Sequence, residues 1–308
     1  MDPMTQTKMS AATANLICML SMLVWAAALP AADVLIGPVP PLPLTAARMA
    51  LAAAVLLPVW LLAEGAQALR GAGWGRGILI GGFIGVGALT LVMGQARTSP
   101  VTVAVISATM PVVGIAIEVF LDGRRMTAGL ILGVVLSLLG GVLAVGNGGG
   151  ASGAALGIGA LLCFGSVVAF TFGSRLTVTA FPALSPLGRT TITLTGAAIA
   201  TTLAATAAHL SGGAQPDWAV LGWREAGALA IFAIGGLAIS QVLWIISVGQ
   251  LGIALSSLHI NMTPFYVMLI LFALGGGWDW LQAIGAVVVL AGVLIAQGVV
   301  PLPRRKEA

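Results

Sequence analysis

The sequence predicts an all-α polytopic membrane protein with ten transmembrane helices, arranged as two inverted repeats of five. Long uncharged stretches are the first observation behind this prediction. Residues 226–278 form a 53-residue stretch without Asp, Glu, Lys or Arg, and residues 126–174 form another of 49. One bilayer crossing needs about 20 apolar residues, so each stretch is long enough for two crossings joined by a tight turn.

Composition is the second observation. The 308 residues are 59% hydrophobic and 7% charged, whereas about a quarter of the residues in ordinary globular domains are charged. So apolar a chain has no room for an attached soluble catalytic, nucleotide-binding or nucleic-acid-binding domain. The net charge of +4 is typical of basic residues near helix ends, which orient a membrane protein and attract anionic lipids without any nucleic-acid partner.

Charges and turn residues separate the predicted spans. Proline lacks the amide hydrogen that continues a helix, so the segment Pro38–Pro43 divides the first two spans, and the glycine run at 148–150 divides the fifth from the sixth. The spans cover residues 12–35, 43–64, 76–95, 100–121, 127–146, 152–174, 186–209, 226–248, 252–275 and 280–299. A cleaved signal peptide is the alternative for the first span, but its apolar stretch runs past Leu29 into further spans.

The distribution of basic residues predicts the orientation. Cytoplasmic loops carry an excess of Lys and Arg, and cytoplasmic N- and C-termini place nine basic residues inside while Asp217 and Asp279 fall outside. The nine are Lys8, Arg70, Arg76, Arg124, Arg125, Arg175, Arg304, Arg305 and Lys306.

An internal repeat is the third observation. Pro111 matches Pro264 at an offset of 153 residues, and the glycines of the fifth and tenth spans match at an offset of 152. The entry to the second span, Pro43 to Arg48, recurs around Pro186 and Arg189. Chance matching in a chain rich in Gly, Leu and Val is the alternative. A true repeat divides the chain into halves at 1–147 and 148–308, and five spans per half force the second copy to enter from the opposite side.

In their order along nearly the whole chain, these features resemble the EamA-type branch of the drug/metabolite transporter superfamily. The resemblance rests on the 5+5 layout, Trp25, the Pro43 to Arg48 entry, and the prolines of the fourth and ninth spans. Within that branch the chain is most similar to bacterial aromatic amino-acid exporters. This resemblance implies export of aromatic and other neutral amino acids across the bacterial inner membrane. The family often has Glu after its fourth and ninth spans, whereas this chain has Asp122 and a glycine run beginning at Gly275.

Polar and aromatic side chains inside the spans are the candidate substrate contacts, because they are costly in hydrocarbon unless they face a cavity or a partner. At 100° per residue, several of them share one face of the eighth span, and others share one face of the ninth. The predicted substrate-binding residues are Trp25, Thr90, Ser107, Ser240, Gln241, Trp244, His259, Thr263 and Tyr266. The alternative is that these groups hydrogen-bond neighbouring helices as packing contacts.

Two prolines and two arginines are candidates for hinge or gating roles. Pro111 and Pro264 occupy corresponding spans and allow helices to bend around a midplane site. Arg48 and Arg189 begin equivalent helices, where they either hold helix ends or gate one side.

Two titratable residues each have two interpretations. His259 is either a proton-coupling site, because histidine titrates near neutral pH, or a satisfied hydrogen-bond partner. Glu118 lies near the cytoplasmic end of its span, where a solvated or paired interfacial carboxylate is favoured over a proton carrier.

The sequence does not predict an enzyme. It contains no HExxH, GxSxG or Walker lysine motif, and no cofactor or metal is expected. Cys18 and Cys163 lie inside predicted helices and act as small apolar residues.

The leading hypothesis is therefore a secondary exporter that works by alternating access. The aromatic residues Trp25, Trp244 and Tyr266 would contact the cargo side chain, while polar residues address its charged groups. No well-buried cation is expected beside the cargo, which favours a zwitterion over an organic anion. Efflux of aromatic cations or drug-like compounds is one alternative, and a membrane-embedded lipid enzyme or scaffold is another. Membrane lipids are the other expected partners, and a homo-oligomer remains open.

Overall fold

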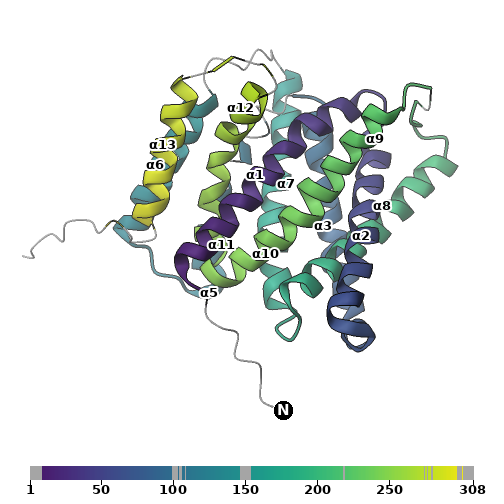
Figure 1. The fold of residues 1–308 in the computed structure, drawn as a ribbon, viewed down its shortest axis with the longest axis horizontal. Coiled ribbons are helices and arrows are strands. Elements are labelled where there is room, and N and C mark those ends of the chain that lie inside the picture. The colour runs from purple at the N-terminus through teal and green to yellow at the C-terminus, as the bar shows by residue number, and fades with distance from the viewer. Residues whose placement is uncertain are drawn as a thin grey trace, which may run out of the picture.

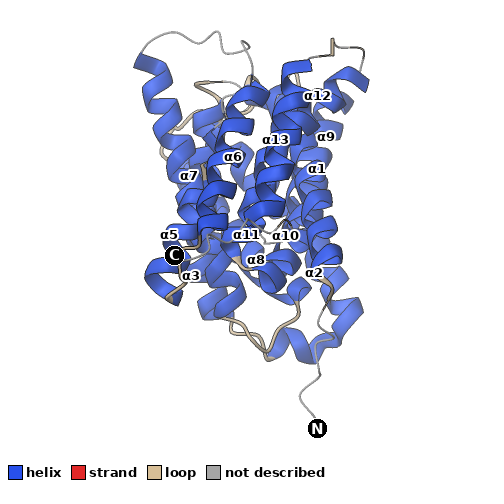
Figure 2. Ribbon diagram, turned by 90° about the vertical axis from the view of Figure 1, so that its left-hand side faces the viewer, coloured by secondary structure: helices blue, strands red, loops and turns tan. Residues whose placement is uncertain are grey.

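Helices make up all the regular structure that the computed structural model describes (Figure 2). The described residues are 9–98, 103, 106–107, 109–145, 154–217, 219–273, 275, 277–278, 280–296 and 300. The first half of the chain contributes α1 (Ala11–Ile36), α2 (Pro41–Arg70), α3 (Trp74–Gln95), α5 (Met110–Asp122) and α6 (Ala128–Val145). The second half contributes α7 (Ala154–Thr179), α8 (Pro186–Leu210), α9 (Trp223–Ala230), the π-helix η1 (Ile231–Ile239), α10 (Ser240–Leu251), α11 (Ile253–Ser257), the 3₁₀-helix η2 (Leu258–Met262), α12 (Thr263–Ala273) and α13 (Trp280–Ala296).

Seven helical segments in the described part of the chain are long and apolar enough to cross a bilayer. They are Ala11–Ile36, Pro41–Arg70, Trp74–Gln95, Gly157–Thr179, Pro186–Leu210, Trp223–Leu251 and Ile253–Ile270. The prediction of a polytopic all-helical membrane protein agrees with this finding. Three further predicted spans correspond to α5, α6 and α13, which are not among the seven, so the count of ten remains a prediction.

Glycine and proline fix where several helices break. The second span was expected to end at residue 64, and Gly65 interrupts α2 there with φ of 79°, a value that residues with a side chain rarely adopt. Gly252, with φ of 80°, separates α10 from α11. Pro111 is the second residue of α5 and Pro264 the second residue of α12, positions where the missing amide hydrogen costs nothing. Pro264 follows directly after the 3₁₀-helix η2, inside the helical segment Ile253–Ile270, and a hinge role for either proline remains a prediction.

Helices from the first half of the chain pack against helices from the second half (Figure 1). Helix α6 lies along α13, α2 packs against α8, α3 packs against both α7 and α8, and α1 packs against η1, α10 and α12. The central core between α1, α10 and the α11 to α12 segment includes Cys18, Met22, Leu29 and Ile245.

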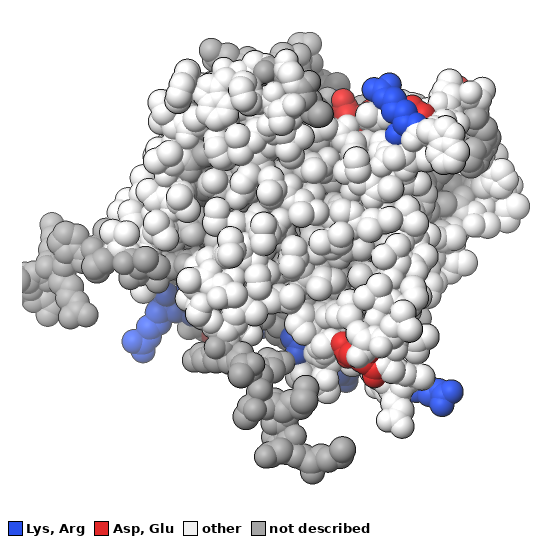
Figure 3. Space-filling view, in the orientation of Figure 1, with Lys and Arg blue, Asp and Glu red and all other residues white. Residues whose placement is uncertain are grey.

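The outer surface is apolar. Leu62, Leu79 and Phe120 are 86%, 76% and 83% exposed, which is expected where a side chain faces lipid instead of water. In the view of Figure 3, charged side chains lie at two opposite ends with an uncharged belt between them. The uncharged belt is the part of the surface that is expected to face the hydrocarbon layer.

Candidate functional site

A small cavity of about 70 Å³ lies in the centre of the helix bundle. Its walls come from both the first and the second half of the chain. The lining residues are Ser21, Met22, Trp25, Arg48, Met49, Ile84, Gly87, Ala88, Leu91, Ser107, Met110, Ser166, Val167, Phe170, Leu194, Gly236, Leu237, Ser240, Gln241, Trp244 and Ile260. Ligand pockets usually exceed about 300 Å³, so a cargo of amino-acid size needs the helices to move apart.

Aromatic side chains form one wall of the cavity. The rings of Phe170 and Trp244 are 5.8 Å apart between centroids and tilted by 35°. The Trp244 indole donates a hydrogen bond to Ser174 Oγ at 2.9 Å, and this bond fixes the orientation of the ring. Trp25 completes this wall from α1. Flat apolar rings held in this way can stack on an aromatic cargo.

Hydroxyl and amide groups supply the polar part. Ser21 Oγ donates to the Ser240 carbonyl at 2.7 Å, and Ser240 Oγ donates to the Gly236 carbonyl at 2.8 Å. These bonds join α1 to the junction of η1 and α10. Buried Gln241 and Ser107 line the same cavity. The cavity therefore offers hydrogen-bonding groups beside its aromatic wall.

Arg48 also lines the cavity, which corrects the expectation that no buried cation lies there. Its side chain is buried, with 3% exposure. Nε donates to the Phe232 carbonyl at 3.2 Å and Nη2 to the Gly236 carbonyl at 3.4 Å. The guanidinium carbon lies 3.9 Å from the centroid of the Phe232 ring. No carboxylate among the described residues pairs with it.

Arg189, the proposed counterpart of Arg48, has a different environment. Its Nε donates to the Phe181 carbonyl at 2.8 Å and its Nη2 to the Pro182 carbonyl at 3.0 Å. It therefore ties the loop before α8 to the first turn of that helix and lies outside the cavity. Of the two roles left open by the sequence, holding a helix end describes its contacts.

Five of the nine predicted substrate-binding residues line the cavity, and four do not. The five are Trp25, Ser107, Ser240, Gln241 and Trp244. Thr90, on α3, donates to the Gly87 carbonyl, while Thr263 and Tyr266 are buried on α12. The His259 imidazole is buried, with Nδ1 3.3 Å from two backbone carbonyls of the preceding helix α11. A cargo contact remains a prediction for all nine residues.

The segment from α11 to α12 holds further buried polar groups. Within the described structure, Ser256 Oγ, Thr263 Oγ1 and the amide of Asn261 have no hydrogen-bond partner. Buried polar groups are normally satisfied by protein or by water. This segment is therefore a polar region beside the cavity.

A larger hollow of about 960 Å³ opens between α2, α3, α8 and α9. We call it the funnel. Ala46 and Ala47 line the funnel, whereas the next two residues, Arg48 and Met49, line the cavity. Arg48 therefore lies where the funnel approaches the cavity.

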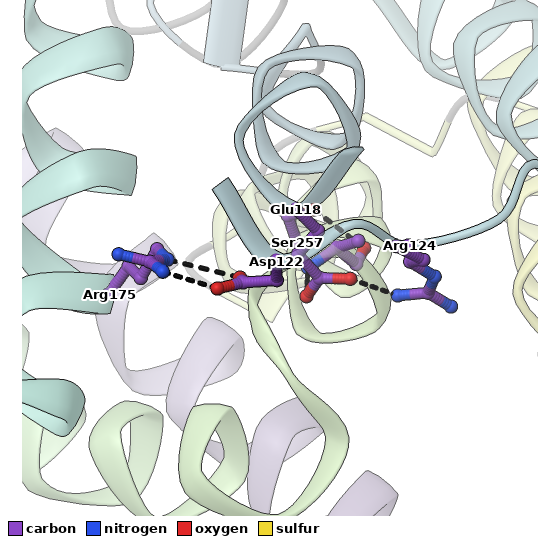
Figure 4. A network of polar contacts seen from close by, with 6 residues as sticks. Glu118, Asp122, Arg124, Arg175 and Ser257 are labelled. Carbon is purple, nitrogen blue, oxygen red and sulfur yellow. Dashed lines mark hydrogen bonds and ion pairs between the residues drawn. The ribbon is translucent and has the colours of Figure 1, made fainter. Parts of the chain in front are cut away.

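The opposite end of the molecule is held by two ion pairs (Figure 4). Glu118 pairs with Arg124 and also accepts a hydrogen bond from the Ala254 amide at 2.8 Å, which joins α5 to the start of α11. Asp122 pairs with Arg175, which joins α5 to α7. Glu118 is thus a paired carboxylate, the alternative that the sequence favoured. The hydrogen bond from Arg175 holds the pKa of Asp122 below its usual value.

Sequence reasoning missed several lining residues. Phe170 and Ser166 lie in the sixth predicted span. The sequence marked this span by its long uncharged stretch, and no face of polar residues was predicted on it. Arg48 was identified, but as a gating residue. Its partners are more than 180 residues away along the chain, so only the fold reveals them. Over the described residues, no group of three or more His, Cys, Asp or Glu residues could hold a metal ion.

The fold and the cavity define a class, an all-helical multi-pass membrane protein with a central polar and aromatic hollow. Residues 12–146 match the model of the EamA-like transporter family. The chain is 28% identical over 262 residues to the "Uncharacterized transporter YyaM" of Bacillus subtilis (strain 168), covering 83% of this chain and 84% of that protein. A crystal structure of another protein has 23% identity and a TM-score of 0.74, covers 93% of this chain and 97% of its own, and shows a shared fold. Together the two sequence matches support a membrane transporter, which over residues 12–146 is similar to the EamA-like transporter family.

Proposed function

We propose that this protein is a secondary exporter of aromatic and other neutral amino acids across the bacterial inner membrane. The single observation that carries the proposal is the central cavity, where an aromatic wall of Trp25, Phe170 and Trp244 lies beside hydroxyl, amide and guanidinium groups. A cargo with an aromatic side chain and a zwitterionic end is complementary to both parts. A transporter similar to the EamA-like family needs a small-molecule substrate. The aromatic and polar lining of the cavity favours a substrate of this chemical class.

The mechanism proposed is alternating access by two inverted halves, 1–147 and 148–308, with ten spans in all. The helix contacts support this symmetry. Exchanging each span with the one five places later converts the contact of α1 with α10 into that of α7 with α3, and the contact of α1 with α12 into that of α7 with α5. Equivalent spans also meet directly, as α2 with α8 and α6 with α13. The matching places of Pro111 and Pro264 fit the same relation.

The proposed orientation has both termini in the cytoplasm. Arg70, Arg76 and Arg175 then lie at the cytoplasmic end together with the two ion pairs, in agreement with the positive-inside rule. The funnel faces the outside. In this arrangement the structure has a closed cytoplasmic end and a hollow toward the periplasm, as expected after cargo has been released outward.

Arg48 weakens the alternative of aromatic-cation efflux. A guanidinium carries its charge at any physiological pH, and a like charge in the same low-dielectric cavity is repelled. The alternative of a lipid enzyme or scaffold predicts no movement of labelled amino acid across a vesicle wall. Both alternatives are therefore separable from the proposal by one transport assay.

The test is counterflow of labelled phenylalanine into proteoliposomes that contain the purified protein, with methyl viologen as the alternative cargo. Wild type is expected to accumulate phenylalanine transiently. Trp244→Ala removes a ring from the cavity wall and Gln241→Ala removes an amide. Both are expected to lower the counterflow rate about fivefold or more, since loss of a buried aromatic contact or hydrogen bond costs about 1 to 3 kcal/mol.

Leu79→Ala is the matched control, because Leu79 faces outward at 76% exposure. It is expected to transport at the wild-type rate. Accumulation of methyl viologen without phenylalanine would replace the proposal with cation efflux. Normal transport by both cavity variants would show that these residues do not form the substrate site, although the protein would still be a transporter.

A further inference from the structure

The charge of Arg48 has no opposite charge beside it in the described structure. Arg48 is the eighth residue of α2, so it lies about 10 Å along the helix from its funnel end at 1.5 Å per residue. A guanidinium at this depth, 3% exposed, is costly unless something neutralises it. The two described ion pairs both lie at the opposite end of the molecule.

Besides its contact with the Phe232 ring, Arg48 is held by two long hydrogen bonds. A guanidinium has five N–H groups, and two of those of Arg48 donate to carbonyls, at 3.2 and 3.4 Å, longer than the usual distance of about 2.9 Å. One of these carbonyls, that of Gly236, already accepts a hydrogen bond from Ser240. The guanidinium therefore keeps donors available for a stronger acceptor.

The local backbone places these contacts in the cavity wall. Both carbonyls belong to the π-helix η1, and π-helical segments within α-helices are frequent at functional sites. The Gly236 backbone approaches α1 so closely that an added Cβ would lie 2.1 Å from the Cβ of Ala28. The π-helix is thus pressed against α1 and presents its carbonyls to α2.

We propose that Arg48 is the binding site for a carboxylate group of the cargo. An arginine fork binds a carboxylate through two parallel charge-assisted hydrogen bonds, and the carboxylate supplies the missing negative charge. The aromatic wall then receives the rest of the molecule. The inference rests on the proposed transport function, and it adds the group by which cargo is selected. Carboxylates of two sources fit this chemistry, a zwitterionic amino acid and an aromatic organic anion.

The test is equilibrium binding to the purified full-length protein, with phenylalanine, 3-phenylpropionate and 2-phenylethylamine as probes. The first two carry a carboxylate and the third does not. Wild type is expected to bind phenylalanine and 3-phenylpropionate more tightly than 2-phenylethylamine. In Arg48→Gln the affinity for both carboxylates is expected to fall between about 10-fold and about 150-fold, the range for hydrogen bonds to charged groups. Affinity for 2-phenylethylamine is expected to stay the same or rise.

Two further variants keep the test interpretable. Arg189→Gln also removes a guanidinium that bonds backbone carbonyls, but outside the cavity, so the ratio of the affinities for the three probes is expected to stay at the wild-type value. Arg48→Lys keeps the charge and loses the fork, so intermediate carboxylate affinity is expected. If Arg48→Gln does not fold, Arg48→Lys provides the test. Its ratio of carboxylate affinity to 2-phenylethylamine affinity is then compared with that of wild type.

The outcomes separate this inference from the proposed function. Arg48-dependent binding of 3-phenylpropionate, without phenylalanine counterflow, would support the carboxylate site and contradict amino-acid export. Phenylalanine counterflow with an unchanged carboxylate preference in the Arg48 variants would overturn the carboxylate site and leave export standing. The inference is also overturned if wild type binds none of the three probes, or binds 2-phenylethylamine as tightly as phenylalanine.

Discussion

Single residues at the closed end of the molecule hold helices together through charge. Asp122 on α5 accepts hydrogen bonds from Arg175 on α7, one of them from Nε at 3.1 Å. Its side chain is 45% exposed and that of Arg175 is 19% exposed, so solvent screens the pair and its stabilisation is small, about 1 kcal/mol or less. Its role lies in which helices it joins.

The pH dependence of this ion pair follows from the pKa of Asp122. The hydrogen bond from Arg175 lowers this pKa from its usual value of 3.8, so the pair stabilises the folded state above that value and is lost as the pH falls through the lower, folded-state pKa. Asp122→Asn is expected to lower the midpoint of thermal unfolding by a constant amount between about pH 5 and about pH 8. Melting curves in detergent across this range would measure the difference.

A difference that disappears between about pH 7 and about pH 6 would contradict this prediction, because a carboxylate with a lowered pKa is fully ionised there. The double variant Asp122→Asn with Arg175→Gln serves as the control. It is expected to lose little more than Asp122→Asn alone, since the two side chains act as one unit.

The cavity residues illustrate what sequence can determine at this scale. Helical periodicity placed Ser240, Gln241 and Trp244 on one face, and all three line the cavity. The same rule placed His259 and Tyr266 on one face of the next span, yet neither lines it. Periodicity states which residues share a face, but not which neighbour that face meets. The contact of Arg48 with Phe232 depends on tertiary packing in the same way.

At the scale of elements, small residues allow the helices to approach closely. The glycines of α3 at positions 77, 81 and 85 are four residues apart and follow one stripe of the helix, a spacing that favours close packing. The structure confirms it, because a Cβ added at Gly81 would lie 2.2 Å from the Thr193 carbonyl oxygen of α8. Backbone atoms cannot yield as a flexible side chain can.

Gly81→Ala is therefore expected to destabilise the protein by about 1 to 3 kcal/mol, the usual cost of overpacking. Unfolding by heat or by sodium dodecyl sulfate in mixed micelles would measure it. Gly82→Ala is the matched control on the same helix, since its added Cβ would make an ordinary contact of 3.7 Å with Ala200. Equal stability of the two variants would show that α3 and α8 are not held as closely as described.

Element boundaries were predictable where the chain carries a strong local signal. The turn at Gly65, the prolines before α2 and the apolar length of the spans all act within a few residues. The division of the eighth and ninth spans into α-helical, π-helical and 3₁₀ pieces was not predicted. Those changes depend on partners such as Arg48, which binds η1 from another helix.

For the whole molecule, the two hollows and the ion pairs describe one state of a proposed cycle. At one end an ion pair joins α5 to α7 and a hydrogen bond joins α5 to α11, while the funnel opens at the other end. The cavity between them, of about 70 Å³, is smaller than usual ligand pockets, so the lining helices must move apart to admit the proposed cargo. Length and hydropathy predict the class of fold, but only the packed helices locate this hollow between the two halves.

Access to the cavity from each side in turn is the central claim. The direct measurement places a cysteine at Ala88, which lines the cavity, in a protein whose buried Cys18 and Cys163 are replaced by Ala. A membrane-impermeant maleimide is then applied to proteoliposomes of known orientation, from outside or from the lumen, with and without phenylalanine. The account predicts labelling from both sides and slower labelling when phenylalanine is present. Labelling from one side alone under all conditions, or from neither, would contradict it.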